Sequence, residues 1–225
     1  MKNTLRFIGI LFMGITAAVT LLGGVGTTCV ALNPAGYESM KAIASLQWLY
    51  ILYVLIGVAL GILGIRATIQ LVRGKAGAEK TALLVLVGGI VIGGIHMATS
   101  RALRGNSMPV DGVVYITVLT LIIFLIFRLP GVAALEIFKK EDNSSPDSAG
   151  GITAFSAGLL TLGVQFWAGP THVLAGTNYA DAFHNAMTFS GAGLILLGTV
   201  MIAWSFPLVR SLVSRQARVI RQIAD

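Results

Sequence analysis

The chain has 225 residues, of which 56% are hydrophobic and only 11% are charged, and its mean hydropathy is +0.85. A soluble domain carries about 25% charged residues, so this composition excludes a water-soluble globule and makes lipid the expected solvent for much of the chain. The net charge of +7 does not indicate a nucleic-acid partner, because the basic residues flank apolar runs rather than forming a basic face with interleaved aromatic residues.

The first apolar run, Leu5–Val25, has two basic residues at its start, Lys2 and Arg6. This arrangement is shared with secretory signal peptides, whose apolar part has about 7–15 residues. The run here is longer and suffices to cross a bilayer core of about 30 Å. We therefore expect a retained membrane-spanning helix.

Five further apolar runs follow, and the runs pair into three out-and-back hairpins. Three of the six runs are short for a bilayer, and we expect the fourth to continue past Arg128 and Pro130, with Arg128 reaching back to the interface. The sequence thus predicts an all-α polytopic membrane protein with six transmembrane helices, the last five being Leu46–Ile65, Thr81–Ala98, Val113–Phe127, Gly151–Trp167 and Met187–Phe206.

The basic residues predict the orientation of these hairpins. All but three of the 16 Lys and Arg residues lie on one side of the threading, and the exceptions are Lys41, Arg101 and Arg104. Cytoplasmic loops carry the excess of Lys and Arg. We therefore expect a multi-pass protein of the cell membrane with both termini in the cytoplasm. The outer loops would be Gly26–Ser45, Thr99–Gly112 and Ala168–Ala186, and the first and third are long enough to hold short interfacial helices.

The chain divides into three parts at a polar segment. Residues 1–138 hold the first two hairpins, and residues 139–150 (KKEDNSSPDSAG) are typical of a flexible cytoplasmic linker. Residues 151–225 hold the third hairpin and a basic tail, Pro207–Ala224, whose apolar residues recur near helical spacing. This tail predicts an amphipathic helix, for which anchoring at the inner leaflet is favoured over docking on a partner.

Small residues four positions apart occur in two runs, as Gly57 with Gly61 and as Gly89 with Gly93. Such pairs lie on one helix face and allow two backbones to approach closely. We expect packing within the bundle, and packing against another subunit is the alternative.

Motifs of catalysis and of ion-coupled transport are missing from the sequence. No Asp, Glu or Lys occupies the middle of a predicted span, where an ionisable residue would mark coupled transport. No nucleotide-binding, zinc-protease or nucleophile-elbow motif occurs. An enzyme is therefore not favoured.

Residues able to bind a metal or a cofactor gather at the predicted outer side. They are Cys29, His96, His172 and His184, and they predict a copper or zinc site. Alternatively, His96 and His184 would ligate a haem from two helices. The ordinary interpretation is that interfacial histidines bond to loop carbonyls or water. Asp181 would orient His184 from one helical turn away or, following Asn178, would serve only at a helix N-terminus.

These observations give three functional hypotheses. The first is a non-catalytic integral membrane subunit or interaction protein of a larger membrane assembly, with the bilayer and other membrane subunits or further copies of itself as partners. The second is a transporter or channel for a small or apolar solute, which requires a polar cavity near the middle of the bilayer. The third is a redox protein that uses the outer histidines to hold haem or a metal ion.

Overall fold

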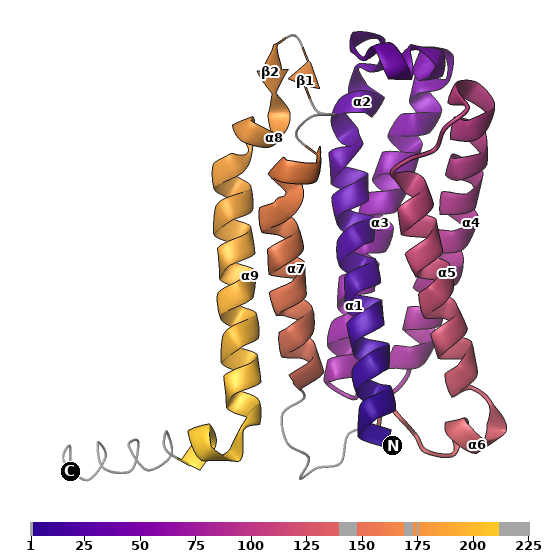
Figure 1. Ribbon diagram of the computed structural model, residues 1–225. Coiled ribbons are helices and arrows are strands. Elements are labelled where there is room, and N and C mark those ends of the chain that lie inside the picture. Colours follow the sequence, from indigo (N-terminus) through magenta and orange to yellow (C-terminus); the bar gives the residue numbers. More distant parts are fainter. Residues whose placement is uncertain (1, 140–147, 169–172, 175, 212–225) are drawn as a thin grey trace.

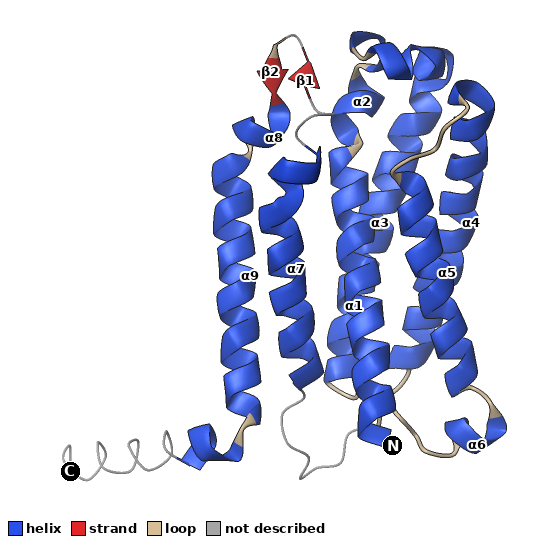
Figure 2. Cartoon of the chain, in the orientation of Figure 1, coloured by secondary structure: helices blue, strands red, loops and turns tan. Residues whose placement is uncertain are grey.

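The expectation of an all-α fold is confirmed by the computed structural model, which describes residues 2–139, 148–168, 173–174 and 176–211 (Figures 1 and 2). A single small β-hairpin, of β1 and β2, interrupts the helices in this part of the chain. The elements are α1 (Lys2–Gly26), α2 (Thr28–Leu32), the 3₁₀ helices η1 (Pro34–Gly36) and η2 (Glu38–Leu46), α3 (Gln47–Val72), α4 (Ala78–Arg104), α5 (Val110–Phe127), α6 (Pro130–Ala133), α7 (Ser148–Ala168), β1 (Val173–Leu174), β2 (Thr177–Asn178), α8 (Tyr179–Ala182) and α9 (His184–Ser205).

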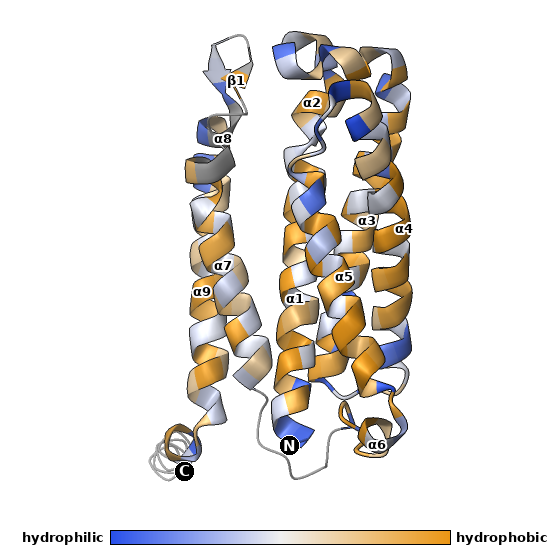
Figure 3. Cartoon of the chain, turned by 45° about the vertical axis from the view of Figure 1, so that its right-hand side comes forward, coloured by the Kyte–Doolittle hydropathy of each residue, from blue (hydrophilic) through white to orange (hydrophobic). Residues whose placement is uncertain are grey.

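Five helical stretches are long and apolar enough to cross a membrane. They are Lys2–Leu32, Glu38–Val72, Ala78–Arg104, Val110–Phe127 and His184–Ser205. A sixth helix, α7, has 21 residues, and its apolar stretch Ser148–Val164 is shorter. Figure 3 shows apolar residues along the length of the helices. This pattern is that of a protein surrounded by lipid.

Helix α1 lies at the centre of the arrangement. It packs against α3, α5 and α7, while α4 packs against α3 and α5, and α9 packs mainly against α7 (Figures 1 and 3). The start of α1 and the end of α9 lie at the same end of the molecule (Figure 1). We call this the inner end, after the orientation that the basic residues predict, and the opposite end the outer end.

The first outer loop contains short helices, as its length suggested, whereas the third contains a β-hairpin as well as a short helix. Helix α2, η1 and η2 occupy the first loop, and β1, β2 and α8 occupy the third. In the first loop, the Gln47 side-chain amide donates a hydrogen bond of 2.7 Å to the Leu32 carbonyl and joins the start of α3 to the end of α2.

The end of α3 is closed by its own backbone and by a side chain from α1. Gly74, at a positive φ of 64°, begins the turn, and the amides of Gly74 and Lys75 bond back to the Leu71 and Gln70 carbonyls. This is the Schellman pattern, in which glycine relieves the steric cost of the left-handed conformation. The buried Arg6 guanidinium then donates to the Leu71 and Val72 carbonyls at 3.0 and 2.9 Å.

The fourth span does not continue past Arg128, contrary to the expectation from sequence. Helix α5 ends at Phe127, with Arg128 as its C-terminal cap, and Leu129 is extended, with φ −60° and ψ 139°. The cause is Pro130, whose ring disfavours helical geometry in the residue before it. Pro130 instead begins the separate helix α6, since proline suits the first turn of a helix.

The inner half of the bundle is a dry apolar core. Phe124, Phe127 and Phe138 form an aromatic cluster, with the rings of Phe124 and Phe138 stacked at 5.5 Å. Fully buried aliphatic side chains from four different helices surround this cluster, and they include Ile10, Met13, Leu71 and Leu86.

Glycines set the closest helix contacts, as expected from their spacing. A Cβ on Gly61 would meet the Leu21 Cα at 2.8 Å, and one on Gly93 would meet Val114 at 2.8 Å. The α7–α9 pair is closer still, because a Cβ on Gly198 would lie 2.5 Å from the Phe155 backbone nitrogen. The glycines therefore serve packing within the chain.

Two predicted segments fall largely outside the described residues. These are positions 140–147 of the linker 139–150 and positions 212–225 of the basic tail. Positions 148–150 of the expected linker are the first residues of α7.

Candidate functional site

The structure distributes the predicted ligands over different elements. Cys29 is half-buried in α2, His96 lies in α4, His184 begins α9, and His172 lies outside the described residues. Helices α4 and α9 lie on opposite sides of α1 and α7 (Figures 1 and 3). Within the described ranges, no group of three His, Cys, Asp or Glu residues is placed to hold a metal ion. The arrangement gives no support to a haem held by both His96 and His184.

The expected pairing of Asp181 with His184 on one helix is also interrupted. Asp181 belongs to α8, which ends at Ala182, whereas His184 begins α9. Phe183 lies between the two helices and has non-helical backbone angles, φ −96° and ψ 9°. The carboxylate and the imidazole are therefore not neighbours on a continuous helix.

His96 packs instead against two tyrosines of α3. Its ring stacks on Tyr53 with centroids 4.4 Å apart and an interplanar angle of 17°, and it meets Tyr50 edge-on at 5.2 Å. The Tyr53 hydroxyl lies 3.2 Å from Thr99 Oγ1, and the Tyr50 hydroxyl lies 2.9 Å from Ser100 Oγ. Two rings and two hydroxyl pairs thus fix the imidazole between α3 and α4.

The nitrogens of the fixed imidazole have no hydrogen-bond partner among the described residues. The His96 side chain is half-buried, so its nitrogens are accessible from the adjoining space. The ring lines a cavity of about 70 Å³ between α1, α3, α4 and α5. We call this space the outer cavity. Its polar lining comprises His96, Tyr53, Thr20, Thr27 and Thr117.

Five glycines line the outer cavity. Gly57, Gly89 and Gly93 contribute from α3 and α4, and Gly23 and Gly24 contribute from α1. A Cβ on Gly93 or Gly24 would meet a neighbouring helix at 2.8 or 3.0 Å, so the helices approach closely here and the cavity is the volume that remains between them. A water needs about 10–15 Å³ of such volume, so the cavity suits a few waters or a solute of a few heavy atoms. Drug-sized ligands need roughly 300–1,000 Å³, and a haem is larger than this cavity.

A pair of threonines lies one helical turn inward from the cavity. The Thr16 and Thr120 hydroxyls are 2.7 Å apart and buried. Because Thr120 donates its own proton to the Ile116 carbonyl at 2.8 Å, Thr16 is the donor in the pair. The two threonines do not line the cavity, and the apolar core lies on their inner side.

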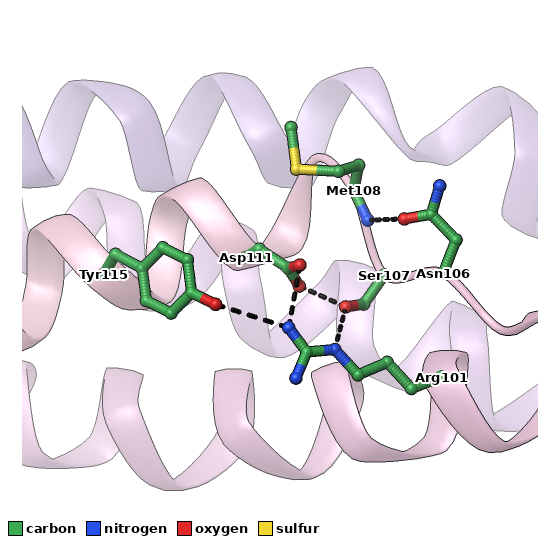
Figure 4. Close-up of polar contacts among 6 residues, drawn as sticks. All are labelled: Arg101, Asn106, Ser107, Met108, Asp111 and Tyr115. Carbon is green, nitrogen blue, oxygen red and sulfur yellow. Dashed lines mark hydrogen bonds and ion pairs between the residues drawn. The ribbon is translucent and has the colours of Figure 1, made fainter.

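At the outer end, polar contacts fasten the loop that joins α4 to α5 (Figure 4). Arg101 donates to Ser107 Oγ at 2.9 Å, to Asp111 Oδ2 at 3.0 Å and to the Tyr115 hydroxyl at 3.3 Å, and Ser107 bonds to Asp111. Arg104 donates to the Ser39 carbonyl at 3.2 Å and joins this loop to the first one. These bonds hold Pro109 and Val110, which line the cavity, over its outer part.

Sequence reasoning identified His96 but not the residues around it. The signal for the threonines was present: Thr16 and Thr20 are four apart on one run, and Thr117 and Thr120 are three apart on another. Such spacings place hydroxyls on one helix face.

Comparison with protein-family models, curated proteins and solved structures finds no match. A function is therefore inferred from the residues that line the cavity.

Proposed function

We propose that the chain is an integral membrane protein of the transporter class that takes a small, uncharged polar solute into the outer cavity. The proposal includes six membrane-spanning helices in three hairpins and both termini in the cytoplasm. The observation that carries it is the His96 imidazole, which lines the outer cavity while its nitrogens have no partner among the described residues.

The lining favours a neutral solute. His96 is the one ionisable imidazole on it, and the other polar groups are hydroxyls of Thr20, Thr27, Thr117 and Tyr53. Among the residues that the structure describes, no carboxylate, Lys or Arg lines the cavity. An ion would leave its charge in a low-dielectric region without a counter-charge, which costs far more than burial of a hydrogen-bonded neutral group.

The sealed inner half favours a carrier over an open channel. Phe124, Leu86 and Met13 are completely buried on the inner side of the Thr16–Thr120 pair. A hydrated solute cannot pass this core without a rearrangement of the helices, as alternating access requires. We expect slow, saturable flux.

Replacing His96 by phenylalanine tests the proposal. The aromatic ring keeps the stacking on Tyr53 but removes both nitrogens, so solute affinity should fall about tenfold, as expected for the loss of one hydrogen bond. The measurement is stopped-flow light scattering of proteoliposomes challenged with glycerol, urea or formamide. Gly94→Ala in the same helix is the control, because its Cβ would meet nothing within 4 Å.

Two outcomes would contradict this function. The first is wild-type flux that equals that of protein-free liposomes for all three solutes. The second is His96→Phe flux equal to wild type at every concentration, with both proteins melting at the same temperature. A loss of flux in the Gly94→Ala control would show that the assay reports general damage to α4.

The orientation is tested separately by cysteine accessibility. In a Cys29→Ser background, Thr177→Cys in β2 should react with a membrane-impermeant maleimide in intact cells, and Ser211→Cys should react only after permeabilisation. Both parent positions are exposed, so reactivity reports the side of the membrane. The reverse pattern would overturn the proposed threading.

A place in a larger membrane assembly is a second proposal. It is favoured by the peripheral position of α9, which packs mainly against α7 and leaves Phe189 80% and Leu196 67% exposed. Lipid covers such a face as readily as protein does. Purification from mild detergent as a lone monomer, with no partner and no self-association, would count against it.

A further inference from the structure

A second pocket lies at the inner end, far from the outer cavity. It has a volume of about 440 Å³ and is bounded by the α3–α4 turn, the first turn of α4, the end of α5 and the segment that follows α6. We call it the inner pocket. This volume falls within the roughly 300–1,000 Å³ range of pockets that hold organic ligands.

Three cationic side chains line the inner pocket, and they are Lys75, Arg128 and Lys139. Lys139 is neutralised by Glu136, at 2.8 Å, and the hydrogen bond from Lys139 holds the pKa of Glu136 below its ordinary value. This pair therefore contributes no net charge at neutral pH.

The other two cations are less well compensated. Arg128 Nε lies 3.5 Å from Glu79 Oε1, longer than a good hydrogen bond, and the guanidinium donates to no described acceptor. Lys75 forms no ion pair with any described residue. Both side chains are exposed, so their donors are available to an anion that enters the pocket.

Apolar side chains lie beside these cations. Phe127, Ile137 and Phe138 line the pocket but are themselves buried, and the exposed apolar side chain is Leu129, next to Arg128 and 55% exposed. Cations next to an exposed leucine match an anionic phospholipid, with its phosphate at the cations and its acyl chains along the helices.

We propose that the inner pocket binds the phosphate group of an anionic phospholipid of the inner leaflet, through Lys75 and Arg128. Free inorganic phosphate offers the same chemistry without the chains, and the experiment separates the two. The choice of the inner leaflet rests on the orientation given in the proposed function, but the proposal does not depend on the outer cavity, because the two pockets share no lining residue.

The test is native mass spectrometry and thermal unfolding of the detergent-purified chain with added phosphatidylglycerol, phosphatidylcholine or inorganic phosphate. We expect phosphatidylglycerol to remain bound and to raise the melting temperature more than the other two. Lys75→Gln with Arg128→Gln should weaken this binding about tenfold, since each cation near the headgroups contributes to attraction of an anionic lipid. High salt should weaken it as well.

The control removes two other basic residues of the same end, by Arg66→Gln with Arg73→Gln. Both are exposed and neither lines the pocket, so the loss of net charge is matched and lipid binding should persist. Lys75→Gln alone, which breaks no ion pair, should weaken binding partially without lowering the melting temperature of the lipid-free protein.

Three results would overturn the proposal. Undiminished phosphatidylglycerol binding by the Lys75→Gln, Arg128→Gln protein would exclude these two side chains. Equal weakening in the Arg66→Gln, Arg73→Gln control would reduce the effect to general charge attraction. Equal stabilisation by inorganic phosphate would assign the pocket to free phosphate instead of lipid.

Discussion

Replacing Arg6 by methionine should lower the melting temperature of the purified protein by about 10 °C, the shift expected for a loss of about 3 kcal/mol in a chain of this size. Arg6 is only 8% exposed. It donates hydrogen bonds to the carbonyls of Leu71, Val72 and Phe138, the last at 2.7 Å. Methionine fills similar volume but leaves these carbonyls without their charged donor.

Two further variants show whether the hydrogen bonds are responsible. Arg6→Lys keeps the charge but lacks the planar fork that reaches several acceptors, so an intermediate loss of stability is expected. Arg66→Met removes an exposed charge and should change stability little. Equal melting temperatures for Arg6→Met and Arg66→Met would show that the buried contacts of Arg6 do not stabilise the fold.

Replacing Gly198 by leucine should separate α9 from α7. A Cβ at this position would lie 2.5 Å from the Phe155 nitrogen and 2.6 Å from the Gly151 carbonyl oxygen. Both atoms belong to backbone and cannot rotate away, so the helix pair must move apart. Overpacking of this kind costs about 1–3 kcal/mol, or more where backbone shifts, and we expect easier thermal unfolding and faster proteolysis.

Gly193→Leu is the matched control, because it makes the same change in the same helix where a Cβ would meet nothing within 4 Å. It should unfold like the wild type. Neither α7 nor α9 lines the outer cavity, so solute flux should persist in Gly198→Leu at temperatures where the variant stays folded. Identical stability of the two leucine variants would contradict the close packing of α7 and α9.

The positions of the helices were predictable because apolar length is a property of the sequence itself. Each apolar run lies in a helix, although the ends differ: the run at 46–65 belongs to α3, which extends to Val72. An apolar run ends at the first charged residue, but a helix continues as long as its backbone hydrogen bonds continue. Helix α4, for example, includes Arg101 and Arg104. The interruption at Leu129 was also available from Pro130, through the restriction that proline places on the preceding residue.

The role of Arg6 was not predictable in the same way. In the sequence it is one of the basic residues that indicate orientation, and such residues usually lie at the lipid headgroups. In the structure it is buried because acceptors 65 and 132 positions away converge on it. The contact of His96 with the two tyrosines could not be predicted for a similar reason. Which residues of α3 and α4 face each other depends on the rotation of each helix about its axis, and hydropathy does not encode that rotation.

The central place of α1 bears on how the molecule is built during translation. The ribosome makes α1 before α3, α5 and α7, yet α1 is the wall against which all three pack. Helix α1 is therefore made before the helices that cover it, and the hydrogen bond from Arg6 to the Phe138 carbonyl can form only after Phe138 has been synthesised. A chain without α1 would keep the α3–α4, α4–α5 and α7–α9 contacts but would lose most of the contacts that join the α7–α9 pair to the other helices.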